Sequence, residues 1–190
     1  MSPCFHRIGG GHLTQLHILY ENPAWLPPLI GALERKGVPF TTHLVTSGSI
    51  DLSQVPAEGI YLNRMSPSAH TRGNQGGVRL VTEMLRWLEA NGRRVLNGTH
   101  AFDLELSKSR QDLALRAAGI LTPKTVVAVG LDDLKRASRT MTLPFIIKHN
   151  QGGKGLGVRL FNDLDSFDDF LLNDEFEDDP NGVNILQEYI

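Results

Sequence analysis

The segment with the clearest chemical potential is an apolar strand that ends in a lysine and continues into a glycine-rich loop. The run 144–147 (Pro-Phe-Ile-Ile) leads directly to Lys148. The loop that follows carries four glycines and a second lysine, namely Gly152, Gly153, Lys154, Gly155 and Gly157. Glycine allows backbone N–H groups to converge on phosphate oxygens, and lysine adds a positive charge. The pattern favours a phosphate-binding loop, and its plain alternative is a flexible hairpin tip.

This loop differs from two common nucleotide-binding glycine motifs. It lacks the Gly-Lys-Ser/Thr of a Walker A loop and the Gly-x-Gly-x-x-Gly of dinucleotide sites. A nicotinamide-dependent enzyme is disfavoured for a second reason. The segment Tyr20-Glu21-Asn22-Pro23, rather than a glycine-rich turn, follows the first predicted strand.

Hydrophobic spacing and turn residues predict two kinds of unit along the chain. In the first half strands alternate with helices, which predicts an α/β unit with a parallel sheet. Its strands are expected at 14–20, 38–45, 59–62 and 94–97, and its helices at 25–33 and 78–88. The second half reads as an α+β unit with helices at 107–118, 132–139 and 165–172 and strands at 124–129, 145–148, 158–161 and 183–190. We therefore predict a flexible leader at 1–13 and domains at 14–105 and 106–190.

The composition is that of a globular protein and excludes several classes. Apolar residues make up 41% of the chain, yet no apolar run approaches the roughly 20 residues that a membrane-spanning helix needs. The single cysteine, Cys4, cannot form an internal disulfide, which favours a cytoplasmic location. Lysines and arginines are scattered rather than clustered, which argues against nucleic acid. The acidic run 173–180 is interpreted as a solvated loop.

Three segments, taken in order, resemble the ATP-grasp superfamily, and most closely its RimK-type branch of amino-acid and glutamate ligases. They are the helix that begins at Ser107-Lys108, the strand–Lys148–glycine-loop unit, and the terminal Gln187-Glu188-Tyr189-Ile190. The resemblance is strong over about 96–190. It is weaker over the preceding α/β unit, where 61–68 looks like that family's strand-to-loop exit. It implies a pre-ATP-grasp-like α/β domain followed by an α+β ATP-grasp subdomain that stops at the hinge strand.

The resemblance also implies which residues bind ATP. Lys108 and Lys148 match the two lysines that contact the α- and β-phosphates, and the glycine loop 152–157 matches the flexible loop that closes over the phosphates. Glu188 matches the acid that accepts a hydrogen bond from the adenine amino group. Tyr189 and Ile190 match the hinge strand whose backbone reads the purine edge. An apolar slot that includes Ile146 and Ile190 is expected to take the adenine ring.

One candidate substrate residue comes from position alone. Arg72 lies on a loop after a predicted strand end, where α/β domains place ligands. It is a candidate for binding a substrate carboxylate, and a surface role is the alternative.

The resemblance implies an ATP-dependent carboxylate–amine ligase that works through an acyl phosphate. Its expected partners are ATP, a small-molecule or peptide carboxylate and an amino acid, and a homo-oligomer is left open. In the family the carboxylates that hold Mg²⁺ lie beyond the hinge strand, so we expect them beyond residue 190 and expect residues 1–190 to be inactive alone. The segment Asp179-Pro180-Asn181 is interpreted as a loop, and the seven histidines show no zinc-ligand spacing. The alternative function is a non-catalytic module that binds adenine nucleotides.

Overall fold

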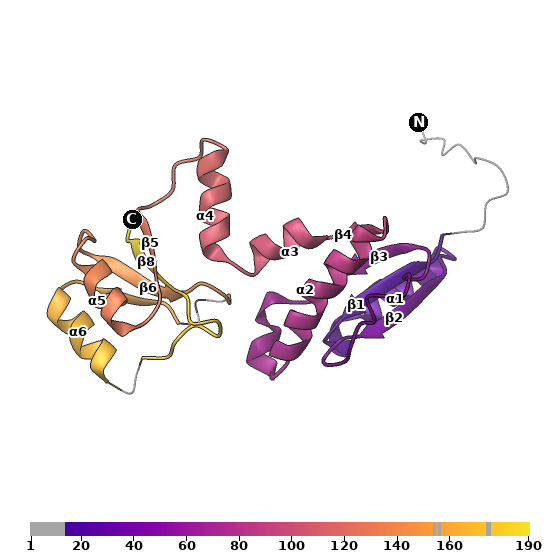
Figure 1. Cartoon of the computed structure of the whole chain (residues 1–190), viewed down its shortest axis with the longest axis horizontal. Coiled ribbons are helices and arrows are strands. Elements are labelled where there is room, and N and C mark those ends of the chain that lie inside the picture. The colour runs from indigo at the N-terminus through magenta and orange to yellow at the C-terminus, as the bar shows by residue number, and fades with distance from the viewer. Residues whose placement is uncertain (1–13, 154, 156, 174–175) are drawn as a thin grey trace.

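The chain forms two lobes, each built around one four-stranded sheet (Figure 1). The computed structural model describes residues 14–153, 155, 157–173 and 176–190. The predicted leader 1–13 and Lys154 therefore lie outside the described residues. None of the described helices combines the length and apolar character needed to cross a bilayer.

The first lobe contains a parallel sheet, as the alternation of strands and helices predicted. The strands have the order β2-β1-β3-β4. They are β1 (Leu16–Tyr20), β2 (Phe40–Leu44), β3 (Ile60–Asn63) and β4 (Arg94–Leu96). The helices are η1 (Pro23–Trp25), α1 (Pro27–Arg35), η2 (Pro67–Arg72), α2 (Gln75–Ala90) and α3 (Thr99–Glu105). The α/β class predicted for this half is confirmed.

Helix α2 supplies more buried residues to the first core than any other element. Val81, Leu85 and Leu88 recur at helical spacing and are completely buried, and they pack with Leu19 and Tyr61 of the sheet. Helix α3 was not predicted. It places its one buried residue, Phe102, in the same core and leads the chain toward the second lobe.

The second lobe contains an antiparallel sheet of order β5-β8-β6-β7. Its strands are β5 (Thr125–Ala128), β6 (Phe145–His149), β7 (Arg159–Phe161) and β8 (Asn184–Glu188). Its helices are α4 (Lys108–Ala117), α5 (Leu131–Ser138) and α6 (Leu164–Leu172). The hairpin of β6 and β7 around the glycine loop is confirmed. Strand β8 is shorter than predicted because it ends at Glu188, so Tyr189 and Ile190 follow the strand.

One face of the second sheet carries the core of this lobe. Phe145, Phe161 and Phe167 are almost completely buried, and their rings meet edge-on or tilted with centroids 4.9–5.9 Å apart. Phe167 comes from α6, and Leu134 of α5 joins the same cluster. Successive residues of a strand point to opposite faces. Ile146 and Lys148 therefore lie on the face away from this core.

We expect Phe167→Ala to lower the free energy of unfolding of the second lobe by about 3–5 kcal/mol, since it removes the ring that contacts both other phenylalanines. Chemical denaturation followed by circular dichroism would measure this loss. The matched control is Leu172→Ala on the same helix, which is 79% exposed and should change stability by less than about 0.5 kcal/mol.

The same variant tests the predicted domain boundary near residue 105. Both tryptophans, Trp25 and Trp87, belong to the first lobe, so tryptophan fluorescence reports on that lobe alone. Two independently folding domains would leave the fluorescence transition of Phe167→Ala unchanged. A fluorescence transition that moves together with the circular dichroism would contradict the boundary.

Candidate functional site

The second sheet presents a lysine beside an exposed apolar strip. Strand register places Ile146 opposite Gln187 and opposite Leu160, so these three side chains share the face away from the phenylalanine core. Leu160 is 42% exposed and Val127, on the same face of β5, is 47% exposed. Lys148 extends from this face two residues after Ile146. The arrangement offers a flat apolar surface with a cation at one end.

Lys148 is held in a short chain of polar side chains. Its Nζ donates to Gln187 Oε1 at 2.6 Å, and Gln187 Nε2 donates to Thr125 Oγ1 at 2.8 Å. Partial burial lowers the pKa of Lys148, and the negative charge of Asp112 on α4 opposes that shift. An anion that approaches a partly desolvated ammonium group of this kind stabilises its positive charge.

Lys108 begins α4 and joins that helix to the end of β6. Ser107 caps the helix by accepting a hydrogen bond from the backbone N–H of Arg110. The Nζ atom of Lys108 donates to the carbonyl oxygens of His149 at 2.9 Å and Gly152 at 3.0 Å. Burial lowers the pKa of Lys108, the positive charge of Lys148 lowers it further, and Asp179 opposes both effects. Lys148 is therefore close enough for its charge to act on Lys108.

A second set of contacts fixes the same junction through Asn150. The backbone N–H of Lys108 donates to the Asn150 carbonyl at 3.0 Å, and the N–H of Ser109 donates to Asn150 Oδ1 at 2.9 Å. The Ser107 hydroxyl is also within 3.3 Å of Asn150 Oδ1. The start of α4 and the start of the glycine loop are thus one hydrogen-bonded unit.

The backbone of the glycine loop adopts conformations that favour glycine. Gly152 and Gly157 have φ values of 121° and 69°, in the region that L side chains rarely adopt. A Cβ on Gly157 would lie 2.8 Å from the His149 ring, so this position also lacks room for a side chain. At Gly153 and at Gly155 a Cβ would meet open space. Lys154, predicted to contact phosphate, lies outside the described residues.

The residues predicted to contact adenine lie at the far end of β8. The carboxylate of Glu188 accepts from the backbone N–H of Lys124 at 3.3 Å, and the Glu188 N–H donates to the Lys124 carbonyl at 2.9 Å. Tyr189 is 56% exposed and Ile190 is 90% exposed. Glu188 pairs with Phe145 and Lys148 pairs with Ile185, so Glu188 and Lys148 lie near opposite ends of the β6–β8 pair, with the Glu188 side chain on the face of Phe145.

The interpretation of the acidic run 173–180 as a solvated loop is wrong for Asp179. This residue is 4% exposed, and its carboxylate accepts from the backbone N–H groups of Gln151 at 2.7 Å and Asn181 at 2.8 Å. Burial of a carboxylate costs energy unless hydrogen bonds compensate for it, and these two backbone donors do so. Asp179 anchors the start of the glycine loop.

Gln151 connects this loop to the first lobe. Its side chain is almost completely buried, and Nε2 donates to the carbonyl of Pro67 at 3.0 Å in η2. Its Oε1 accepts from Asn181 Nδ2 at 2.6 Å, and Gln75 of α2 donates to Asn181 Oδ1 at 3.4 Å. Four residues that are distant in sequence thus tie the glycine loop to the carboxyl edge of the parallel sheet.

Arg72 lies near this edge, but its charge is already engaged. The guanidinium forms an ion pair with Glu21, whose side chain is 1% exposed, and Asn74 donates to the same carboxylate at 2.9 Å. The guanidinium also lies over the Trp25 ring, 4.9 Å from its centroid. The substrate-binding role of Arg72 stays a prediction, and a substrate carboxylate would have to compete with Glu21.

Several residues that shape the site were missed by sequence reasoning. They are Asp112, Asn150, Gln151, Asp179 and Gln187, which orient the two lysines or the glycine loop. The signal for Asp179 was local, because Asp-Pro-Asn-Gly is a turn sequence in which an aspartate bonds the backbone two residues later. Asn150, Gln151 and Gln187 bond partners that are 28 to 43 positions away in the sequence, and Asp112 acts through the packing of α4. Spacing along the sequence shows neither kind of contact.

The described part of the chain contains no group of three or more histidine, cysteine, aspartate or glutamate side chains that could hold a metal ion. A Mg²⁺ site is therefore not assigned to any residue of this chain.

The sequence comparisons find no match for this chain, whereas the comparison of structures finds proteins with the same fold. No family model matches the sequence, and no curated protein matches it. Among solved structures, a RimK-domain ATP-grasp protein from Sphaerobacter thermophilus matches 93% of this chain with a TM-score of 0.63 and 17% identity. The ADP complex of PurK, an N5-carboxyaminoimidazole ribonucleotide synthetase, matches 94% with a TM-score of 0.60 and 12% identity. The ATP-grasp ligase PsnB, in complex with minimal precursor, Mg and ADP, matches 97% with a TM-score of 0.54 and 16% identity.

These neighbours define the fold as that of ATP-grasp ligases, and the predicted resemblance, including its RimK-type character, is confirmed at the level of fold. This chain spans 64%, 47% and 66% of the lengths of the three structures. The domain limits predicted at 105 and 106 and the roles of individual residues stay predictions.

We expect Gln151→Ala to loosen the contact between η2 and the glycine loop, because it removes the bonds to Pro67 and Asn181. Losing a buried hydrogen bond of this kind costs about 1–3 kcal/mol, so amide exchange in residues 68–74 should accelerate roughly tenfold or more. Hydrogen exchange measured by mass spectrometry would show this change.

Gln15→Ala is the matched control, since the Gln15 amide bonds Thr41 within the first lobe. It should leave the exchange of residues 68–74 unaltered. Equal exchange in wild type and Gln151→Ala would show that Gln151 does not hold the two lobes together.

Proposed function

We propose that this chain carries the ATP-binding part of an ATP-dependent carboxylate–amine ligase of the RimK-like kind. The observation that carries the proposal is the pairing of two partly buried lysines, Lys108 and Lys148, at the mouth of a glycine loop on an exposed apolar sheet face. The fold shared with ATP-grasp ligases supports this reading. The general class rests on that fold, and the RimK-like specificity rests on the sequence motifs.

In this proposal the two lysines offset the charge of the α- and β-phosphates. Both have lowered pKa values because burial removes water from their ammonium groups, so an anionic ligand restores the solvation that they lack. The phosphates compete with the His149 and Gly152 carbonyls for Lys108 and with Gln187 for Lys148. The backbone of the glycine loop adds further donors.

The adenine ring in this proposal lies on the apolar strip that includes Ile146 and Leu160. Glu188 accepts a hydrogen bond from the adenine amino group, and the backbone at Tyr189 and Ile190 follows the purine edge. Ile146 is partly buried and Leu160 is 42% exposed, so an aromatic ring that covers this strip removes apolar surface from water.

The second substrate has a candidate place beside the phosphates. A cavity of about 240 Å³ lies between η2 and the glycine loop, lined by His70 and Thr71 on one side and by Gln151, Gly152 and Gly157 on the other. In the proposed reaction a carboxylate bound there attacks the γ-phosphate, which gives an acyl phosphate and ADP. An amine then displaces inorganic phosphate and forms the amide. Mg²⁺ bound by carboxylates would neutralise phosphate charge during the first step.

Titration of ATP into residues 1–190 tests the binding proposal. We expect Lys148→Ala to weaken ATP binding by roughly tenfold or more, because it removes a charged phosphate contact. Lys36→Ala, which removes an exposed lysine of the first lobe, is the matched control and should bind ATP like the wild type. Equal affinity in all three proteins would contradict the assigned site.

The pH dependence of ATP binding tests the charge state of the lysines. A lysine with a lowered pKa loses its charge at a lower pH than an ordinary lysine, for which the value is 10.5. The affinity should therefore begin to fall, as pH rises, before that value is reached. Lys148→Arg should flatten this dependence because arginine stays charged throughout. An affinity that is constant up to pH 10.5 would contradict the two-lysine site.

Release of ADP in the presence of candidate amino acids separates a ligase from a binding module. The ligase proposal expects amine-dependent ADP release from a protein that contains this chain together with Mg²⁺ ligands. Tight ATP binding without such release, across the amino acids, would favour the alternative of a non-catalytic adenine-nucleotide module.

A further inference from the structure

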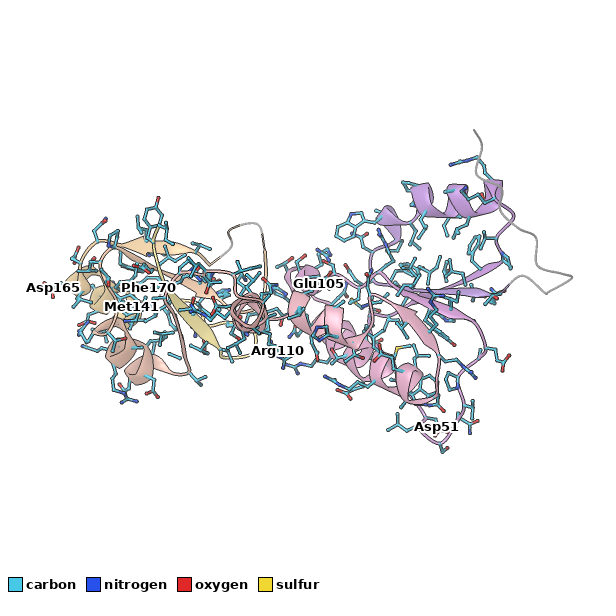
Figure 2. The ribbon with its side chains drawn as sticks, turned by 90° about the horizontal axis from the view of Figure 1, so that it is seen from above. Asp51, Glu105, Arg110, Met141, Asp165 and Phe170 are labelled. Atoms are coloured by element: carbon cyan, nitrogen blue, oxygen red, sulfur yellow. The ribbon has the colours of Figure 1, made fainter. Side chains whose placement is uncertain are left out.

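A second cavity, of about 320 Å³, lies between the two lobes. Its lining includes Arg110 of α4 and Ser107, which caps that helix. Figure 2 shows Arg110 at the narrow junction where the lobes meet. The cavity adjoins the proposed ATP site through Asn150 and Gln151, and its described lining does not include Lys108, Lys148 or Gly152.

The cavity is lined by three arginines and one acid. Arg79 and Arg86 come from α2, Arg110 from α4, and Asp103 from α3. Val78, Leu106 and Val183 add apolar surface to its walls. Its volume is at the lower end of the roughly 300–1,000 Å³ typical of ligand sites.

The positive charge in the cavity is poorly neutralised. Arg86 and Arg110 both approach the same oxygen, Asp103 Oδ1, at 3.4 and 3.3 Å. These distances exceed the roughly 2.7–2.9 Å of strong charge-assisted hydrogen bonds. Arg86 has a further, exposed partner in Glu83 at 3.1 Å. Among the residues that the structure describes, the Arg79 side chain has no ion-pair or hydrogen-bond partner.

We propose that this cavity binds a small polyanion, a phosphate- or carboxylate-bearing molecule with at least two negative charges. Guanidinium groups from α2 and α4 would each bind it in the bidentate manner that suits such oxygens. The ligand would bridge helices of the two lobes. It would also lie against Ser107, Asn150 and Gln151, which hold the start of the glycine loop.

Inorganic pyrophosphate is a suitable probe, and amide shifts in ¹⁵N-labelled protein show where it binds. We expect saturable shifts at Arg79, Thr82, Asp103 and Arg110 that exceed those caused by sodium chloride at equal ionic strength. The double variant Arg79→Gln/Arg110→Gln should weaken this response by roughly tenfold or more. Shifts no larger than those with sodium chloride would overturn the proposal.

Two further variants separate this site from other sources of the response. Lys36→Gln/Arg94→Gln removes the same charge from exposed positions of the first lobe and should retain full affinity. An equal loss of affinity in this control would show that the net charge of the protein, and not the arginine cavity, determines pyrophosphate binding. That result would overturn the proposal. Lys148→Ala should lose pyrophosphate shifts near Lys148 and keep those at the arginines. Loss of the arginine shifts in Lys148→Ala would show that they are transmitted from the ATP site, which also overturns the proposal.

Discussion

The arrangement of the second lobe depends on the ammonium group of Lys108, which is partly withdrawn from water and bonded to backbone carbonyls. A cation in this position is costly unless its donors are satisfied. The carbonyls of His149 and Gly152 satisfy two of them, at 2.9 and 3.0 Å. Those carbonyls belong to the end of β6 and the start of the glycine loop, so this side chain, together with the Asn150 contacts, positions the loop relative to α4. The positive charge of Lys148 acts on the same region and lowers the pKa of Lys108.

The alternation of side chains along β6 divides the second sheet into a structural face and a binding face. Phe145 and Ile147 enter the phenylalanine core, while Ile146 and Lys148 face the open side. The core can therefore be rigid while the opposite face keeps exposed apolar surface beside a cation. Buried Gln151 and Asp179 connect this face to the first lobe, because they join the glycine loop to η2 and to the turn before β8.

Local patterns predicted most of the fold. Apolar runs and turn residues identified the eight strands that the structure describes. Ser107 and Gly119 marked the ends of α4 because they supply a cap and a left-handed turn. Helix α3 was missed because a seven-residue helix with one buried residue has little periodic signal. The long-range partners were missed for another reason. The pairing of Lys148 with Gln187 depends on the register of β6 against β8, and the burial of Asp179 depends on its contact with Gln151. Spacing along the sequence determines neither contact.

The central claim is that adenine lies on the open face of the second sheet with its phosphates at Lys108 and Lys148. Isotope-filtered nuclear Overhauser spectroscopy on methyl-labelled residues 1–190 with unlabelled ATP measures this directly. The account predicts contacts between the adenine protons and the methyl groups of Ile146 and Leu160. Contacts from adenine to methyl groups of the first lobe, or to those lining the arginine cavity, with none to Ile146 or Leu160, would contradict it.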